Sequence, residues 1–409
     1  MTDFSAKLPK LLLGSELEEA LIYLPNINRN EIVNMSANER LLRLTDIFKT
    51  FIPNQMSYEI YQKLYIMTHL SLQQKGNVNS TRQLNANYTW IHGGSFQGVI
   101  TGASSSTIIG VSGIGKTAAI QKAIKLIGPV IEIEKPLHKV IPVLMVTCPF
   151  DSNYKGLLCE ILQKIDASLN TCYYEHSQKS HLTAQQILGL VCQISHLYIG
   201  TLIIDECQFI VEHRAGKQLY MMLMQLINSS QVSILLVGTN ECLSFFQQAP
   251  QIARRAVGLQ YGPMTYGNEF RKLCEALFRH QYTLFETPLT ESLNFWLFEH
   301  CGGIQANLVS LIHSAQEIAI SKGTEKLNIE TLNEAYTIRM RMLHGSIMSN
   351  ITTLPKTSNH NKTRCIFSNL SETETAPLKE TIAEIVAKAK KDRADVISRL
   401  KESITLEEI

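Results

Sequence analysis

The chain has 409 residues, of which 45% are hydrophobic and 18% are charged, so it can bury a large core and is long enough for two or three domains. Its formal net charge of +2 excludes bulk positive charge as a source of nucleic-acid affinity and leaves that role to a local basic patch. There is no apolar run of 18 residues and no signal peptide at Met1, so we expect a protein that is neither secreted nor membrane-spanning.

The nine cysteines are scattered without a C-x-x-C pair, which predicts reduced core thiols in a cytosol. The twelve histidines, among them His176, His181 and His196, do not cluster at the spacings of metal ligands. We therefore interpret them as ordinary surface or boundary residues and expect no histidine or cysteine metal site.

Residues 1–85 are expected to form a small helical region that precedes the main domain. Apolar residues recur at helical spacing in residues 40–48 and again in residues 56–70, and Pro53 with Asn54 separates the two helices.

Residues 86–265 alternate between predicted strands and predicted helices. Strands are expected at 106–109, 140–147, 201–204 and 233–238, and helices at 118–127, 157–169 and 183–199. This alternation predicts an α/β fold in which a parallel sheet is covered by helices on both faces.

The stretch from Gly110 to Thr117 has the spacing G-x-x-x-x-G-K-T between a predicted strand and a predicted helix. Its glycines let consecutive N–H groups turn toward the phosphates of ATP or GTP, Lys116 can reach the β and γ oxygens, and the Thr117 hydroxyl can bind Mg²⁺. The sequence therefore predicts a P-loop whose nucleotide-binding residues are Gly110, Val111, Ser112, Gly113, Ile114, Gly115, Lys116, Thr117 and Ala118.

Two carboxylates follow the predicted central strand at residues 201–204. Asp205 is expected to hold Mg²⁺ through a water, and Glu206 is placed to polarise a water for attack on the γ-phosphorus. The adjacent glutamate favours a hydrolysing ATPase over a small-molecule kinase or a Ras-like GTPase, and the chain has no Asn-Lys-x-Asp guanine-recognition motif.

The predicted strand at 233–238 ends in Thr239 and Asn240, which are expected to orient the attacking water and sense the γ-phosphate. This is the sensor-1 position of AAA+ ATPases, and the same two residues are also good helix N-caps. Arg254 and Arg255 follow, where AAA+ assemblies carry arginines that reach the γ-phosphate of a neighbouring subunit. A solvated pair on a helix is the alternative.

Residues 266–345 are wholly helical in pattern, with helices expected at 268–278, 291–300, 306–322 and 329–342, as in an AAA+ lid. Residues 346–377 are rich in Ser, Thr and Asn and are expected to form a flexible linker. Residues 378–409 carry apolar residues at helical spacing, which predicts an amphipathic tail helix that docks on a partner or folds back on the body.

These motifs together resemble TnsC, the AAA+ regulator of transposons with separate target selectors, and its smaller relative TniB. The resemblance rests on residues 111–117, 203–208, 236–239 and 253–255, with a further similar segment at 148–158. Gln208 after the Asp-Glu pair is typical of that group. The likeness spans about residues 40–310 and includes a helical segment at 51–74 that is similar to the TnsC branch.

The resemblance implies a regulator that binds ATP and Mg²⁺ and assembles as a ring or helical filament around double-stranded DNA without reading its sequence. Its implied partners are transposase subunits and a target-selector protein of the TniQ or TnsD kind, in the bacterial cytoplasm. Slow, oligomer-dependent ATP hydrolysis would remodel or remove the assembly.

Carried onto this chain, the resemblance assigns ATP binding and hydrolysis to Lys116, Thr117, Asp205 and Glu206. Thr239 would be the sensor, and Arg254 and Arg255 would act on a neighbouring subunit. Lys155 is the candidate DNA contact in the pore, although a lone lysine at a helix start is usually only solvated.

One departure concerns the lid. Many AAA+ proteins carry a sensor-2 arginine after a Gly-Gly turn, whereas residues 301–307 offer Asn307 or nothing. A slow ATPase whose bound state is the signal is consistent with that absence.

Two other functions stay open at this stage. An origin initiator or helicase loader would be expected to carry an appended DNA-reading domain, and the tail after residue 345 is too short and polar to be one. A nucleotide switch that acts on protein partners without DNA is the second alternative.

Overall fold

The computed structural model describes residues 4–75, 104–134, 137–151, 153–209, 216–230, 232–242 and 258–341. Arg254, Arg255, the expected linker at 346–377 and the expected tail helix at 378–409 lie outside the described residues. The division of the chain into domains at residues 85, 265, 345 and 377 therefore remains a proposal.

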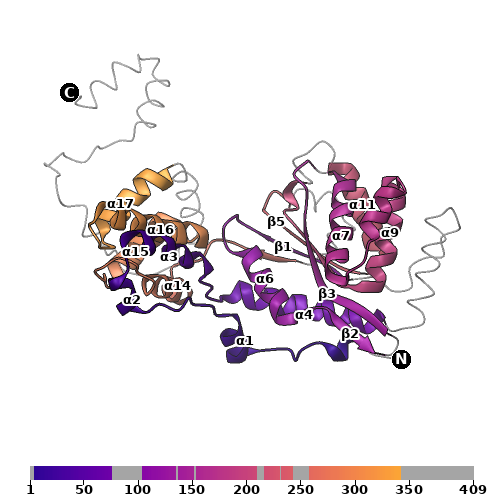
Figure 1. Ribbon diagram of the computed structural model, residues 1–409, viewed down its shortest axis with the longest axis horizontal. Helices are drawn as coiled ribbons and strands as arrows, with labels where there is room; N and C mark the ends of the chain where they lie inside the picture. Colours follow the sequence, from indigo (N-terminus) through magenta and orange to yellow (C-terminus); the bar gives the residue numbers. More distant parts are fainter. Residues whose placement is uncertain are drawn as a thin grey trace, which may run out of the picture. The chain divides into compact units, whose positions relative to one another are not determined.

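A six-stranded sheet in the order β2-β3-β4-β5-β1-β6 forms the centre of the α/β region (Figure 1). Every neighbouring pair is parallel except β2 and β3, which are antiparallel at one edge. The strands are β1 (Ser105–Gly110), β2 (Ile131–Glu134), β3 (Leu137–Thr147), β4 (Ile199–Asp205), β5 (Ser233–Gly238) and β6 (Leu259–Tyr261).

The strand order brings three strand ends together. Strand β5 lies between β1 and β4, with Ile109 beside Gly238 and Ile204 beside Leu236. Because β1, β4 and β5 are parallel, the loops that follow them emerge at the same edge of the sheet, where ligands of α/β proteins bind.

Helices cover both faces of the sheet (Figure 1). One face packs apolar side chains of β3, β4 and β5 against α7 (Tyr154–Leu169), α9 (Ala184–Tyr198) and α11 (Gly216–Ser230). The other face packs against α4 (Gln55–Lys75) and α6 (Lys116–Ile127). The strands of the centre are buried along their whole length, as strands with two covered faces must be. The predicted α/β fold is confirmed.

A separate apolar core holds the helices that follow the sheet, which are α14 (Asn268–Phe278), α15 (Glu291–Cys301), α16 (Gln305–Lys322), α17 (Ile329–Ala335) and the π-helical turn η3 (Tyr336–Met340). These helices agree closely with the four expected from the 266–345 pattern. We call them the lid. None of the helices in the described parts of the chain combines the length and apolar composition that crossing a bilayer would need.

The N-terminal helices divide between the sheet and the lid. Helix α4 and the shorter α1 (Gly14–Leu21) share the core on the α6 side of the sheet. The segment α2 (Arg29–Asn34), α3 (Ala37–Leu44) and η2 (Thr45–Lys49) instead contributes to the apolar packing of the lid. The remaining short elements are η1 (Phe4–Lys7) and α8 (Tyr173–Lys179).

A buried ion pair fixes α3 to the lid. Arg40 donates to both carboxylate oxygens of Glu325 at 2.5 and 2.7 Å and to the Tyr282 carbonyl at 3.1 Å. The side chains of Arg40 and Glu325 are only 4% and 10% exposed. This arrangement lowers the pKa of the Glu325 carboxyl from its ordinary value, chiefly through the hydrogen bond from Arg40. Residues 4–50 therefore belong structurally to two different parts of the protein.

Candidate functional site

The loop between β1 and α6 has the backbone that its glycines predict. Gly113 and Gly115 adopt left-handed φ angles of 82° and 95°, which side chains rarely allow. A Cβ atom on Gly115 would also lie 2.7 Å from the side-chain oxygen of Gln305, and one on Gly110 would lie 2.7 Å from the Tyr261 carbonyl. The glycines are therefore required both by the turn and by the close approach of other segments.

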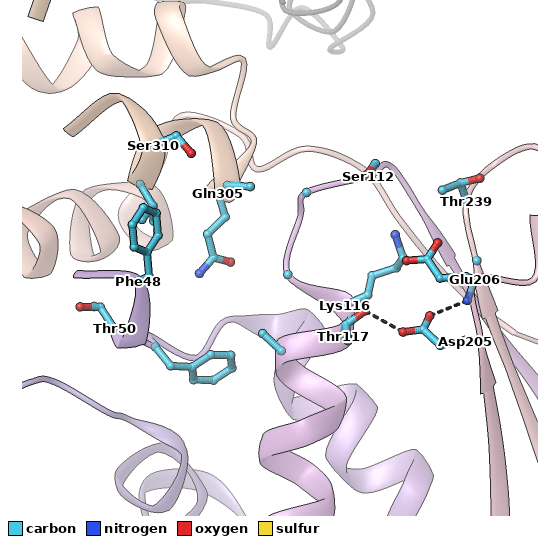
Figure 2. A pocket seen from close by; sticks show the side chains of 17 residues that line it. Phe48, Thr50, Ser112, Lys116, Thr117, Asp205, Glu206, Thr239, Gln305 and Ser310 are labelled. Atoms are coloured by element: carbon cyan, nitrogen blue, oxygen red, sulfur yellow. Dashed lines mark hydrogen bonds between the residues drawn. The ribbon is translucent and has the colours of Figure 1, made fainter. Parts of the chain in front are cut away.

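The charged and hydroxyl side chains of the loop converge on the end of β4. Lys116 is buried, and its ammonium group donates to the carbonyls of Gly110 at 2.8 Å and Val111 at 3.0 Å. Burial lowers the pKa of Lys116, while nearby Asp205 acts in the opposite direction. The Thr117 hydroxyl donates to Asp205 Oδ2 at 2.8 Å (Figure 2).

Glu206 lies beside this cluster in an unusual conformation. Its φ angle is 59°, in the left-handed region, and its backbone N–H donates to Asp205 Oδ1 at 2.9 Å. Glu206 and Lys116 line the same pocket, and Figure 2 shows their side chains beside each other. The two acidic residues predicted from the sequence thus lie at one pocket with the P-loop lysine and threonine.

The end of β5 supplies Thr239 to the same pocket. The Thr239 hydroxyl donates to the Glu241 carboxylate, and the Thr239 carbonyl accepts from the Cys242 N–H at 3.1 Å. Asn240 is exposed and does not line the pocket. The structure therefore brings Thr239 to the site and leaves Asn240 at its margin.

The pocket itself has a volume of about 360 Å³ and lies between the P-loop, the lid and the N-terminal segment. Lys116, Thr117, Asp205 and Glu206 form one side, while residues of η2, the segment after it and α16 form the other (Figure 2). The second side comprises Phe48, Thr50, Phe51, Gln305, Ala306, Val309 and Ser310. A charged wall opposite a wall that mixes aromatic, apolar and neutral polar side chains suits a nucleotide, whose phosphates and base need different environments.

Helix α16 begins directly against the P-loop. The Ala306 N–H donates to the Gly113 carbonyl at 2.9 Å, and the Gln305 side chain points into the pocket (Figure 2). Asn307, the only sensor-2 candidate from the sequence, instead donates to the Cys301 carbonyl at 3.3 Å, at the end of α15. Four residues of α16, Gln305, Ala306, Val309 and Ser310, thus line the pocket, and all are neutral. The sequence did not indicate Gln305 as a pocket residue.

Three buried thiols lie close behind the site. Burial raises the pKa of Cys148 to about 12 and that of Cys207 well above its ordinary value. A Cβ atom on Gly238 would lie 2.5 Å from the sulfur of Cys242. These cysteines act as small apolar residues that pack the strand ends, as expected for core thiols.

Lys155 lies apart from the pocket. It is exposed in the first turn of α7, where the Asn153 side chain accepts hydrogen bonds from the backbone N–H groups of Lys155 at 3.1 Å and Gly156 at 3.2 Å. Among the described residues its ammonium group makes no hydrogen bond or ion pair, so both interpretations of this lysine stay open.

The donor set fits a divalent cation next to the phosphates. Thr117 and Asp205 contribute a hydroxyl and a carboxylate oxygen that already lie within hydrogen-bonding distance, and such oxygens are the ligands that Mg²⁺ prefers. Lys116 occupies its own loop carbonyls and can exchange them for phosphate oxygens, which are stronger acceptors.

A P-loop after β1, an Asp-Glu pair at the end of β4, strand β5 between the two and a helical lid beside the pocket define an AAA+ ATPase fold that binds nucleotide. Within it, residues 101–260 match the protein family described as "Bacterial TniB protein". The match extends from just before β1 to β6 and confirms the resemblance to the TniB family over this segment.

Solved structures with a similar fold include the Aeropyrum pernix ORC1 protein in complex with DNA, with 15% identity, 81% of this chain and 78% of that chain covered, and a TM-score of 0.44. The structure of Drosophila ORC bound to DNA is 12% identical, with 84% of this chain and 80% of that chain covered and a TM-score of 0.40. The structure of Cdc6p from Pyrobaculum aerophilum is 15% identical, with 63% of this chain and 66% of that chain covered and a TM-score of 0.40. No curated protein matches this chain in sequence.

Proposed function

We propose that this protein is an ATP-dependent, DNA-binding regulator of transposition that assembles on target DNA and links a target-selector protein to the transposase. The observation that carries the proposal is that Lys116, Thr117, Asp205 and Glu206 converge on one pocket within the segment that matches the TniB family. The resemblance of residues 51–74 to the TnsC branch supports a TnsC-like regulator.

The P-loop, the two carboxylates and Thr239 each have a role in the proposed hydrolysis of ATP. The N–H groups of the loop from Gly110 to Ala118 and the Lys116 ammonium group hold the phosphates. Thr117 and Asp205 hold Mg²⁺, which supplies positive charge to the phosphate oxygens when bound. Glu206 accepts the proton of the attacking water, and Thr239 marks the position of the γ-phosphate from the end of β5.

The neutral lid supports a slow reaction. Because Gln305 replaces a cation at the lid side of the pocket, negative charge in the transition state lacks one stabilising group within the subunit. Arg254 and Arg255 are proposed to supply this charge from a neighbouring subunit. Hydrolysis would then depend on assembly, and the ATP-bound assembly would persist long enough to recruit the transposase.

Duplex DNA is the proposed scaffold of the assembly. A net charge of +2 gives little long-range attraction, so contacts must be local and repeated in each subunit. Lys155 is the proposed phosphate contact because it is exposed at a helix start, where the backbone also favours anions. Binding that tracks phosphates would be insensitive to sequence and would weaken with salt.

The test measures fluorescence anisotropy of a labelled duplex of random sequence with ATP or ADP. We expect binding in ATP, release in ADP and a fall in affinity with salt. Glu206→Gln should bind ATP and DNA and dissociate at least about 10-fold more slowly, because the base is lost while the phosphate contacts remain. Lys155→Ala should weaken binding of every sequence alike and reduce the salt slope by about one.

Two results would overturn the proposal in different ways. Rapid release of DNA by Glu206→Gln in ATP would remove the assigned role of this residue. Equal, negligible DNA binding in ATP and ADP would instead favour the switch that acts on proteins alone. For the partner assignment, the ATP-loaded complex on DNA should retain purified transposase and selector in co-sedimentation, and the ADP sample should not.

A further inference from the structure

A lysine of the helix that follows the P-loop lies over two aromatic rings of the N-terminal segment. The Lys122 ammonium nitrogen is 4.6 Å from the centre of the Tyr23 ring and 5.4 Å from the centre of the Phe51 ring. Both distances fall within the roughly 6 Å over which a cation is attracted to the face of an aromatic ring. Lys122 belongs to α6, the helix that begins at Lys116, and the P-loop motif requires no lysine at this position.

The backbone holds the two aromatic residues next to each other. The Tyr23 N–H donates to the Phe51 carbonyl at 2.9 Å, and the Phe51 N–H donates to the Tyr23 carbonyl at 2.8 Å. These hydrogen bonds form an isolated antiparallel bridge between the chain that follows α1 and the chain that follows η2. Lys122 therefore contacts a pair of residues that cannot separate without losing two backbone hydrogen bonds.

One of the two rings belongs to the nucleotide pocket. Phe51 is 6% exposed, lines the pocket and packs in the same apolar core as Ile114 of the P-loop. Thr50, the residue before it, lies across the pocket from Lys116 (Figure 2). The position of the Phe51 ring thus helps to set the shape of the wall that faces the P-loop.

The two rings are the specific contacts of the Lys122 ammonium group. Among the described residues, Lys122 makes no hydrogen bond or ion pair. Partial burial lowers its pKa, and the neighbouring Lys125 acts in the same direction. An ammonium group that has lost part of its water gains more from an aromatic face than a fully exposed one does. The rings therefore hold Lys122, and Lys122 in turn holds the rings.

We propose that Lys122 is a positioning residue that holds Phe51, and with it the N-terminal wall of the pocket, in the arrangement that binds ATP. The proposal deepens the proposed ATPase function and rests on it. Lys122 does not itself line the pocket, so its effect on ATP passes through Phe51 and Tyr23. Because α6 also carries Lys116 and Thr117, the helix that meets the phosphates also holds the opposite wall in place.

The position of this wall determines which kinetic constant Lys122 affects. The wall lies across the pocket from Lys116, Asp205 and Glu206, so its contacts with ATP are the same before and during hydrolysis. Contacts that are equal in the ground state and the transition state change KM and leave kcat unaltered. Loss of Lys122 should therefore raise the KM for ATP and leave kcat within about 2-fold.

The test measures ATP affinity by calorimetry, and steady-state hydrolysis, in the full-length wild type, Lys122→Gln and Lys122→Arg. Glutamine keeps the helix propensity and removes the charge, so we expect the affinity to fall about 5-fold, the scale of partly desolvated cation–π contacts. Arginine keeps a cation over the rings and should remain within about 2-fold of the wild type. Lys125→Gln is the matched control, because it removes the same charge from an exposed position of the same helix and should also stay within about 2-fold.

The same contact can be tested from its other side if Lys122→Gln does not fold. Tyr23 is 45% exposed, so Tyr23→Leu removes the ring, leaves the backbone bridge and creates little buried cavity. We expect this variant to bind ATP about 3-fold more weakly and Tyr23→Phe, which keeps the ring, to match the wild type. In the double variant Lys122→Gln with Tyr23→Leu, the two losses should be less than multiplicative, since both remove one contact.

Four results distinguish failure of the inference from failure of the proposed function. Unchanged affinity in both Lys122→Gln and Tyr23→Leu would show that the contact positions nothing. Equal losses in Lys122→Gln and Lys125→Gln would reduce the effect to general charge. A lower Tm of Lys122→Gln at unchanged ATP affinity would make the role of Lys122 merely structural. A wild type that binds no ATP would instead overturn the proposed function, and this inference with it.

Discussion

The ion pair between Arg40 and Glu325 gives the sharpest prediction about stability. Both side chains are almost fully buried, the two hydrogen bonds between them are 2.5 and 2.7 Å long, and Arg40 also donates to the Tyr282 carbonyl. In Arg40→Ala the Glu325 carboxylate keeps the Leu284 N–H at 3.1 Å and loses its counter-charge. Removing one member of such a buried pair lowers the free energy of unfolding by about 3–5 kcal/mol, and we expect Arg40→Ala to lower it by at least about 3 kcal/mol.

The assay is urea unfolding followed by the fluorescence of Trp296, which lies in α15 of the lid. A Trp90→Phe background removes the other of the two tryptophans. Arg339→Ala is the matched control, because it breaks an Arg–Glu pair of 3.3 Å whose side chains are 53% and 38% exposed. Such exposed pairs contribute less than about 1 kcal/mol.

If Arg40→Ala lowered the free energy of unfolding by no more than Arg339→Ala does, the stabilising role of the buried ion pair would be refuted. A double variant, Arg40→Met with Glu325→Met, should recover much of the loss, because an apolar pair leaves no buried charge. Nucleotide affinity offers a second readout: Phe48 and Thr50 follow α3 and line the pocket, so loosening α3 should weaken ATP binding as well.

Three further predictions concern pH and the pocket. Because Arg40 holds the pKa of Glu325 below its ordinary value of 4.5, this carboxylate contributes stability above pH 4.5 that is lost as the pH falls through its folded-state pKa. Glu325→Asn should therefore unfold with a smaller pH dependence in acid, and an identical dependence would contradict the assignment. Lys116→Ala should lose at least about 10-fold in affinity for ATP by calorimetry, since a charged donor to the phosphates is removed, and unchanged affinity would show that Lys116 does not reach them. Gln305→Arg should bind ATP about 10-fold more tightly and favour ATP over ADP, because it places a cation at the lid side of the pocket. Equal affinity in this variant and the wild type would mean that Gln305 does not approach the γ-phosphate.

Much of the sheet and the P-loop could be predicted from the sequence. Short runs of mainly apolar residues such as 201–204 and 233–238 are typical of strands covered on both faces, and the glycine and lysine spacing of 110–117 has few other uses. The three-residue strand β6 and the four-residue β2 were missed because their short patterns carry no periodicity of their own.

The lid side of the pocket could not be predicted in the same way. Helical spacing places Gln305 and Asn307 in the first turn of one helix, but which of them faces the P-loop depends on how that helix docks. The hydrogen bond from Ala306 to Gly113 decides the matter, and it joins residues nearly two hundred positions apart. Likewise, the periodicity of residues 40–48 predicts a helix without showing that its apolar face packs on the lid.

The hydrogen bond from the Gln208 amide to the Glu206 carboxylate lay between these extremes. The sequence drew attention to Gln208 through its resemblance to the TnsC group, yet no spacing rule indicates where an amide two residues after a carboxylate will point. The positive φ of Glu206 brings the two side chains together, and a backbone angle of that kind is not encoded by any local motif.

Electron microscopy of the purified protein on duplex DNA tests the central claim most directly, with wild type in ATP, a non-hydrolysable analogue or ADP and with Glu206→Gln in ATP. We expect rings or filaments on DNA with the analogue and with Glu206→Gln, fewer with the wild type in ATP, and none in ADP. Particles that ignore DNA in every nucleotide state would contradict it.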